Sequence, residues 1–428
     1  MKIILFGAAA VVSILGMTST VHSRPIDSNS NSTTTINTGG LDIYDNEGSI
    51  GLPGWASGDF TRHRFGDTNI TSPTMYPDSK FKFDNDIKDD TTTANRLGRA
   101  KLSTSNNEND VVYDVVIVGA GAAGMGAARR LKLSGVNRVV ILEATSGLGG
   151  RMQTDKTFTG YPLDLGPSYL PGQFFKRELE QIAGQSLSTT RNGQLWKNTS
   201  YNDIFTKFVA PGLDIRYNCA VTEVNYEETN NYTKIKCANG HTFLASYTII
   251  TASIQILKDE DIDFIPKIDP KEYNHREFWS GIKIFLEYDN KFYQRTTFSP
   301  LPPQFDSVGE NLFWDGSVSA PGNPNNADNL LVGYLLGDRA DDVCCSPDEI
   351  KNKVESILEQ KFNRSSGSFN AKRYLIAYDG RNKPYIKGTL SAASQEANFI
   401  PPVVNPGGKN TLIIAGEAYP IPGEEYGT

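Results

Sequence analysis

Residues 114–131 read DVVIVGAGAAGMGAARRL, an apolar run followed by a glycine-rich turn and a row of small residues. The apolar run predicts a buried strand over 112–119, and the residues after the turn predict a helix over 122–133. A second apolar run, NRVVILE at 137–143, predicts the next strand. Strand, helix and strand in this order are typical of an α/β fold, in which a right-handed crossover joins two parallel strands.

The turn has the spacing G-x-G-x-x-G, formed by Gly119, Gly121 and Gly124. The first glycine permits a tight turn, the second lets the backbone approach a pyrophosphate, and the third lets the helix pack on the strand. The helix N-terminus adds free N–H groups for the phosphates. Glu143 ends the second strand, where it can accept the ribose hydroxyls of an adenosine and would repel the 2′-phosphate of NADP. The pattern predicts NAD or FAD here, and a glycine turn without a ligand is the alternative.

The composition and the first residues bear on where the protein acts. The formal net charge of −7 gives no general attraction for nucleic acid or for an anionic membrane. Residues 1–23 have the pattern of a secretory signal, with an apolar run over 3–15 that is too short for the alternative, a membrane anchor. We therefore expect a secreted protein without stable membrane insertion. Asn-x-Ser/Thr triplets suit this route and begin at Asn31, Asn69, Asn198, Asn231 and Asn363.

The distribution of residue types predicts one disordered segment and argues against a disulfide framework and a metal site. Residues 24–110 are rich in small polar residues and lack apolar periodicity, which predicts a disordered leader. The four cysteines are too few for a disulfide framework in a chain of 428 residues, and adjacent cysteines rarely bridge each other. None of the four histidines stands beside a cysteine, so no metal site is expected. The cysteines are Cys219, Cys237, Cys344 and Cys345.

Further elements follow the glycine turn. The clearest helix is expected at 346–362, where Ser346 caps the first turn and Glu349 completes a capping box. Its apolar stripe indicates a scaffold role. Strands are expected at 213–228, 232–240, 241–253, 282–293, 329–337 and 411–419.

Several motifs after the second strand resemble those of the FAD-dependent amine oxidases. EATSGLGGRMQT is similar to a glycine-glycine-arginine motif in which Arg151 would reach the pyrophosphate, a suitable role for a fixed cationic fork. YPLDLGPSYLPG resembles the family's second flavin loop, and IIAGEAY its last flavin strand, where Glu417 would meet the ribitol hydroxyls. Looser matches place Val221 near the adenine and the KGTLS segment near the flavin ring. The cofactor residues implied are Gly119, Gly121, Ala123, Gly124, Glu143, Ala144, Gly150, Arg151, Gly166, Pro167, Ser168, Val221, Gly416, Glu417 and Thr428.

The resemblance also implies a domain organisation. It predicts a Rossmann-like FAD-binding domain with a parallel sheet and an α+β substrate domain with a mixed sheet. The FAD-binding parts would be 111–172, 211–265 and 406–428, with a reduced helical segment at 173–210 and the substrate-binding domain at 266–405.

The sequence departs from the family in two places. Residues 186–200 are poor helix formers, although the family has a large helical layer in this region. The sequence ends at Thr428, where the family continues into a helix that faces the flavin and often carries an aromatic residue. We therefore expect that FAD is held through its adenosine half and that its ring is held loosely.

WSGIKIFLEYDNKFY resembles the strand that carries the family's active-site lysine, which falls on Lys283. This implies that Lys283 holds a water near flavin N5 and assists reoxidation or imine hydrolysis. A solvated surface lysine is the alternative. Alternation places Lys283, Phe285 and Glu287 on one face of the strand, and the phenylalanine argues against a face that is simply exposed to solvent.

The implied reaction is oxidation of an amine C–N bond by O₂ to an aldehyde, a shorter amine and H₂O₂. IKIF and KGTLS look most like the polyamine oxidases, and FAD should be non-covalent because no cysteine lies near Thr389. Glu287, Leu390 and Tyr426 would line the substrate site, since carboxylates and aromatic faces attract ammonium groups. Ordinary surface charge and packing are the alternatives for Glu287 and Tyr426.

Two other functions stay open at this point. One is an L-amino-acid oxidase of the same fold, in which Arg373 or Arg381 would pair with the substrate carboxylate. The other is a flavin-fold binding protein without catalysis, because the helical segment is short. The sequence does not indicate an oligomeric state.

Overall fold

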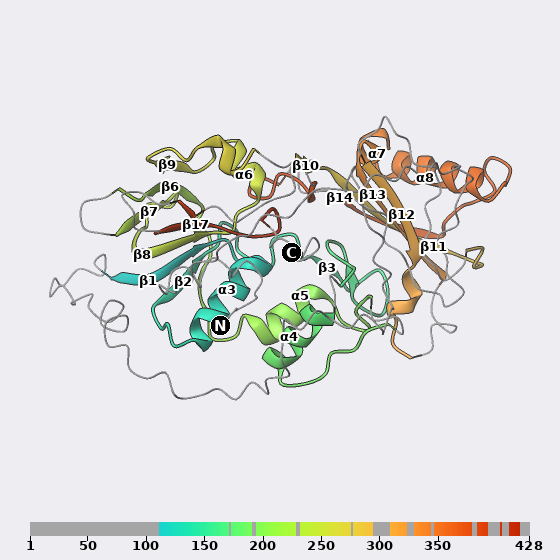
Figure 1. Ribbon diagram of the computed structural model, residues 1–428. Helices are drawn as coiled ribbons and strands as arrows, with labels where there is room; N and C mark the ends of the chain where they lie inside the picture. Colours follow the sequence, from blue (N-terminus) through green and yellow to red (C-terminus); the bar gives the residue numbers. More distant parts are fainter. Residues whose placement is uncertain are drawn as a thin grey trace, which may run out of the picture. The chain divides into compact units, whose positions relative to one another are not determined.

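The strand, helix and strand predicted around the glycine turn are present in the computed structural model (Figure 1). They are β1 (Val112–Val118), α3 (Ala122–Leu133) and β2 (Val139–Leu142), and β1 pairs with β2 in parallel. The structure describes residues 111–170, 173–190, 194–227, 232–274, 277–293, 309–322, 329–343, 346–378, 383–392, 403–404 and 411–419.

These described residues belong to one compact unit. The predicted signal at 1–23, the leader at 24–110 and the expectations for Tyr426 and Thr428 lie outside them. None of the helices in the described part combines the length and apolar character that a membrane crossing needs.

The large sheet contains the parallel strands of the predicted Rossmann-like domain. Its parallel strands run in the order β5, β2, β1, β8 and β17, where β5 is Asp214–Arg216, β8 is Thr242–Ile250 and β17 is Leu412–Ile414. This order brings the C-terminal end of β17, far along the chain, beside the glycine turn after β1. Ligands of open α/β sheets bind at this edge, outside the carboxyl ends of the strands.

An antiparallel branch extends the same sheet from the first half of β8. It consists of β7 (Thr233–Cys237) and β6 (Val221–Asn225), followed by β9 (Asp263–Ile265), which pairs in parallel with β6. The short β16 (Val403–Val404) pairs antiparallel with β17. The sheet is therefore mixed, and the predicted α/β class is confirmed.

The two faces of β1 bury different cores because side chains alternate along a strand. Val115 and Ile117 pack with α3 and with the helical segment, and Val116 and Val118 pack with β6, β7 and α6 (Ile254–Lys258). The helical segment consists of α4 (Gln173–Ala183), α5 (Tyr201–Ile204) and the π-helical turn η2 (Phe205–Val209).

No helix forms in the described residues between α4 and α5, as the poor helix formers at 186–200 predict. Isolated bridges join Tyr169 to Leu195 and Thr189 to Trp196 instead.

A second sheet contains four strands, which are labelled in Figure 1. They are hydrogen-bonded in the order β12, β13, β11 and β14. All of its pairs are antiparallel, so the mixture of strand directions expected for the substrate domain occurs in the large sheet instead. Alternate residues of β11 pack against α8 (Pro347–Lys361) on one face, in a core that includes Ile284 and Leu286. The four strands are β12 (Gly309–Asp315), β13 (Asn329–Gly337), β11 (Gly281–Tyr288) and β14 (Arg373–Tyr378).

The helix α8 (Pro347–Lys361) begins as the sequence predicts. Ser346 accepts a hydrogen bond from the Glu349 N–H, and the Glu349 carboxylate accepts one from the Ser346 N–H, which completes the capping box. The short helix α7 (Asp338–Asp342) precedes it. Two small antiparallel pairs complete the described strands, β3 (Thr154–Asp155) with β4 (Leu163–Asp164) and β10 (Glu277–Trp279) with β15 (Leu390–Ala392).

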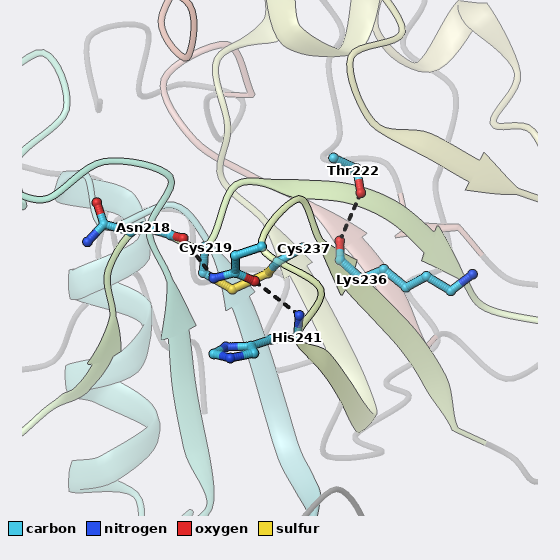
Figure 2. The surroundings of a disulfide bond; sticks show 7 residues. Asn218, Cys219, Thr222, Lys236, Cys237 and His241 are labelled. Atoms are coloured by element: carbon cyan, nitrogen blue, oxygen red, sulfur yellow. Dashed lines mark hydrogen bonds between the residues drawn. A yellow bond between two sulfur atoms is a disulfide. The ribbon is translucent and has the colours of Figure 1, made fainter.

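One disulfide joins Cys219 to Cys237, between the segment that precedes β6 and the end of β7 (Figure 2). The sequence did not single out this pair. Cys344 and Cys345 lie outside the described residues.

Candidate functional site

The glycine turn adopts the geometry that its spacing predicts. A Cβ atom at Gly124 would lie 1.9 Å from the Gly119 carbonyl oxygen, so only glycine lets α3 pack this closely. At Gly121 a Cβ would meet no atom within 4 Å. Gly121 is also the N-cap of α3 and makes no side-chain cap bond, which leaves the first N–H groups of the helix available for an anion.

Glu143 lies directly beside this turn and is buried, with 8% of its surface exposed. One carboxylate oxygen accepts the Ala120 N–H at 2.8 Å. The other accepts the Thr145 N–H at 2.9 Å and the Thr145 hydroxyl at 2.7 Å. These donors fix the carboxylate next to the phosphate-binding turn, where the adenosine ribose of a dinucleotide would lie.

Residues distant in sequence meet at the same turn. The Gly149 N–H donates to the Ala120 carbonyl at 2.8 Å, and a Cβ at Gly150 would lie 3.7 Å from the Gly121 Cα. From the C-terminal strand, a Cβ at Gly416 would lie 3.9 Å from the Cβ of Ala123. The structure therefore brings the glycine-glycine-arginine motif and the last flavin strand together at the start of α3.

Arg151 and Glu417 form the next part of the site. An Arg151 N–H group donates to the Thr389 carbonyl at 2.9 Å and to a Glu417 oxygen at 3.1 Å. The other Glu417 oxygen accepts the Ser391 N–H at 2.8 Å and the Ser391 hydroxyl at 2.7 Å. The guanidinium also lies over the Phe278 ring, 5.6 Å from its centroid. A fixed cation and a fixed carboxylate thus stand side by side.

The second flavin loop packs against Arg151 and is held by Lys283. A Cβ at Gly166 would lie 1.9 Å from the Arg151 carbonyl oxygen, so this approach also requires glycine. Lys283 Nζ donates to the Asp164 carbonyl at 3.1 Å, to the Gly166 carbonyl, and to the Ser168 hydroxyl at 2.7 Å. The predicted catalytic lysine therefore meets the predicted flavin loop.

Lys283 is buried, with 2% of its surface exposed, so it is not the solvated lysine of the alternative interpretation. Its ammonium group lies 4.9 Å from the Tyr334 ring centroid and 5.7 Å from that of Trp314. Burial lowers the pKa of Lys283, and the charge of Asp164 opposes this effect. Burial likewise raises the pKa of the Asp164 carboxyl, against the effect of Lys283. Burial therefore disfavours the charged form of both groups, and their mutual attraction favours it.

A small cavity of about 30 Å³ has room for a water molecule. Its lining includes Asp164, Ser168 and Trp314, which Lys283 also contacts. Aromatic and aliphatic side chains form most of its wall, and Asp164, Ser168 and Thr199 add polar groups. Its other lining residues include Leu163, Trp196, Phe285, Trp314 and Val332.

The predicted substrate residue Glu287 lies elsewhere on β11. It lies four positions after Lys283, which is about 13 Å along a strand. Its carboxylate accepts hydrogen bonds from Arg373, whose guanidinium lies 4.9 Å from the Phe158 ring centroid. A substrate role for Glu287 stays a prediction, as does that of Leu390 in β15, and Tyr426 lies outside the described residues.

The described residues fit FAD. The turn at Gly121 is open, the helix N-terminus is uncapped, and Glu143, Arg151 and Glu417 are held by specific donors and acceptors. Val221 is buried in β6, close along the chain to the disulfide. Among the described residues, no group of three or more His, Cys, Asp or Glu side chains gathers into a metal site.

Comparisons with known proteins agree with this site. A family profile described as "Flavin containing amine oxidoreductase" matches residues 192–420, just over half of the 428 residues. A profile described as "NAD(P)-binding Rossmann-like domain" matches residues 117–185. The chain therefore belongs to the flavin-containing amine oxidoreductases. This membership confirms the predicted class, and with it FAD as a non-covalent cofactor.

Individual relatives match over short stretches. "Lysine-specific histone demethylase 1 homolog 3" of Arabidopsis thaliana is 47% identical over 58 residues, which is 14% of this chain and 4% of that protein. "Polyamine oxidase 1" of Zea mays is 43% identical over 58 residues, which is 14% of this chain and 11% of that protein. The first curated relatives are thus matched over 4% to 15% of their length.

A solved structure of wild-type putrescine oxidase bound to putrescine is similar with a TM-score of 0.52 and 15% identity. The similarity covers 74% of this chain and 96% of that one. At this identity the likeness concerns the fold.

Sequence reasoning missed three groups that support the site. Thr251 directly follows β8, and its hydroxyl donates to the Val118 carbonyl at 2.8 Å and to the Gly119 carbonyl at 3.2 Å. Its place after a parallel strand was a usable signal, because such strand ends meet at one edge. Ser391, which holds Glu417, and the pair Cys219–Cys237 depend on contacts between distant segments and left no local signal.

Proposed function

We propose that the protein is a secreted FAD-dependent amine oxidase of the polyamine oxidase kind. It would oxidise a C–N bond of an amine with O₂ and water to an aldehyde, a shorter amine and H₂O₂. The observation that carries this proposal is Lys283, which is buried and bonded to the loop at 164–168 beside Arg151. The names of the polyamine oxidases among the relatives support the substrate class.

The chain's own residues have separate roles in this proposal. The glycine turn, Glu143 and Arg151 bind and orient FAD, which when bound would accept the two electrons removed from the amine. Lys283 holds or moves a proton at its Nζ atom, and its lowered pKa gives it a larger neutral fraction than an ordinary lysine has at the same pH. Lys283, Phe285 and Trp314 are all buried, which would keep bulk water away from the Nζ atom.

The position of Arg373 disfavours the L-amino-acid oxidase. That reaction needs a cation near the reacting carbon to pair with the substrate carboxylate. Arg373 is paired with Glu287 at the far part of β11, about 13 Å from Lys283 along the strand. Arg381 lies outside the described residues.

A substrate panel tests the proposal. The holoprotein is mixed with spermine, spermidine, putrescine, benzylamine, L-phenylalanine or a dimethyl-lysine peptide, and H₂O₂ release is measured. Turnover of the polyamines is expected. Turnover of L-phenylalanine alone would favour the amino-acid oxidase, and turnover of the peptide alone a demethylase. FAD binding without any turnover would favour the non-catalytic protein.

Secretion is part of the same proposal. The signal-like N-terminus supports it, as does Cys219–Cys237, because disulfides form and persist in oxidising compartments. Asn198 and Asn363 are exposed acceptors in the described residues. Expression in a eukaryotic secretory host should release the protein into the medium, shortened near residue 23 and with a mass that falls after glycosidase treatment. An intracellular, full-length and glycan-free product would contradict this part.

A further inference from the structure

The disulfide Cys219–Cys237, shown in Figure 2, has no part in the proposed chemistry. It lies close to Glu143, because the Cys219 N–H donates to the Glu143 carbonyl. Its two Cα atoms are 5.3 Å apart. Both cysteines are buried, with 1% and 4% of their surface exposed. Cys219 lies between β5 and β6, and Cys237 is the last residue of β7.

The backbone around Cys219 is bonded directly to the segment that carries Glu143. The Cys219 N–H donates to the Glu143 carbonyl at 2.9 Å, and the Asn218 N–H donates to the Thr145 carbonyl at 2.9 Å. On the other side, the Glu143 N–H donates to the Arg216 carbonyl at 2.8 Å. Residues 216–219 are therefore joined to residues 143–145 by three backbone hydrogen bonds, two donated by 218–219 and one donated by Glu143.

These backbone contacts also affect the Glu143 carboxylate. Thr145, which is bonded to Asn218, donates both its N–H and its hydroxyl to one oxygen of Glu143. A shift of the connection would therefore move a donor of the carboxylate that we place at the ribose. Val221, predicted to lie near the adenine, follows Cys219 by two residues and is opposite Cys237 in the β6–β7 pair.

The strand pairing alone does not fix this end of the hairpin. The β6–β7 register shifts between Val221 and Glu223, so the backbone ladder is interrupted beside the disulfide. Asn218 has a φ of 55°, which is a left-handed conformation that holds the connection in a sharp turn. A covalent link at Cys219 constrains the backbone where the ladder does not.

We propose that Cys219–Cys237 is a positioning element for the adenosine half of FAD. It holds the backbone at 218–219 against Glu143 and Thr145, and it keeps Val221 in register beside them. The proposal concerns cofactor binding and rests on the FAD site, not on the identity of the amine. A protein that binds ADP but oxidises no amine would leave it intact.

The test measures binding of FAD and of ADP to the apoprotein, by flavin fluorescence and by calorimetry. A double variant with Cys219→Ala and Cys237→Ala should raise the Kd for both ligands about tenfold, as expected when one or two hydrogen bonds lose their geometry. A control variant, Ile350→Ala, destabilises the distant core under α8 and should leave both Kd values within about twofold while the protein is folded. Equal effects of the two variants would show a general stability effect and overturn the proposal.

Two further measurements separate a local effect on the cofactor site from a general loss of folding. In combination with Glu143→Gln, the cysteine variant should add less than its separate effect, because both changes disturb the same contact. Full additivity of the two effects would show that the disulfide does not act through the contacts of Glu143. If the double variant does not fold, the native holoprotein is reduced and alkylated, with reaction at both cysteines verified by mass spectrometry. FAD release should then be about tenfold faster than from untreated protein, and an unchanged release rate would overturn the proposal.

Discussion

The two ends of the cofactor site are built in different ways. At the nucleotide end, the turn at 119–124 and the segment at 143–150 bind mainly through backbone atoms, with glycines where atoms approach closely. At the lysine end, a single buried side chain from β11 reaches a loop more than a hundred residues away. The first end depends on glycines at the close approaches and on the Glu143 carboxylate held beside them. The second depends on one buried side chain in a place where charge is costly.

This difference predicts different consequences for mutation. Changes at the nucleotide end should alter folding or cofactor affinity and leave the intrinsic chemistry untouched. Changes at Lys283 should alter the chemistry and leave the affinity for FAD nearly the same.

The largest effect is expected at Gly124. Gly124→Ala places a Cβ 1.9 Å from the Gly119 carbonyl oxygen, so the turn or the helix must move. We expect unfolding free energy to fall by about 3 kcal/mol and FAD binding to be lost. Gly121→Ala is the matched control, because its Cβ meets no protein atom within 4 Å. Denaturant unfolding should show a nearly native fold for the control together with weakened FAD binding, and equal stability of the two variants would refute this account of the turn.

The next effect is on the reaction rate. Lys283→Met should lower turnover by a factor of about 10²–10⁴, the usual range for loss of a proton-transfer group. FAD affinity should change little. The exposed Lys207→Met provides the control. An equally fast Lys283→Met variant would mean that the lysine has no catalytic role.

The pH dependence of turnover is a second test of the catalytic role of Lys283. Burial lowers the pKa of Lys283, so its neutral fraction rises with pH within a range below that of an ordinary lysine. If neutral Lys283 accepts a proton, the rate should rise as the pH increases through this lowered pKa, and this rise should be absent in Lys283→Met. Rate measurements from pH 5 to pH 10 on both proteins would show it, and the same rise in both would assign the titration to another group.

A moderate effect is expected at Arg151. Arg151→Lys keeps the charge but cannot reproduce the planar fork that bonds to Thr389 and Glu417. We expect the Kd for FAD to rise about tenfold, equivalent to about 1.4 kcal/mol, with the fold intact. A titration of the apoprotein measures this, and unchanged affinity would show that the guanidinium geometry is not used.

The smallest effect is expected far from both ends, at the start of α8. Ser346→Ala removes the N-cap and should cost about 1 kcal/mol of stability. It should change neither the Kd for FAD nor turnover, because α8 packs on the opposite face of β11 from Lys283. A shift in either of these by more than about threefold, or roughly 0.6 kcal/mol, would indicate that the two faces of the sheet are coupled.

The difference between the two ends of the site also explains which features could be predicted from the sequence. The strand, turn and helix at 112–133 follow local rules of periodicity and glycine spacing, and the observed bounds of α3 agree with the prediction. The capping box of α8 was equally local. Lys283 could be placed on a strand, but its burial depends on Tyr334, Trp314 and the loop at 164–168, which only the folded chain brings together. For the same reason, periodicity did not reveal the pairing of Glu287 with Arg373.

The central claim is that the glycine turn and Glu143 bind FAD. The most direct measurement is the identity and amount of the cofactor in the purified protein, after reconstitution with FAD and removal of the excess. We predict flavin absorption bands, close to one FAD per chain, and complete release of FAD by acid because no covalent bond holds it. The absence of flavin bands, or the release of FMN in place of FAD, would contradict the claim.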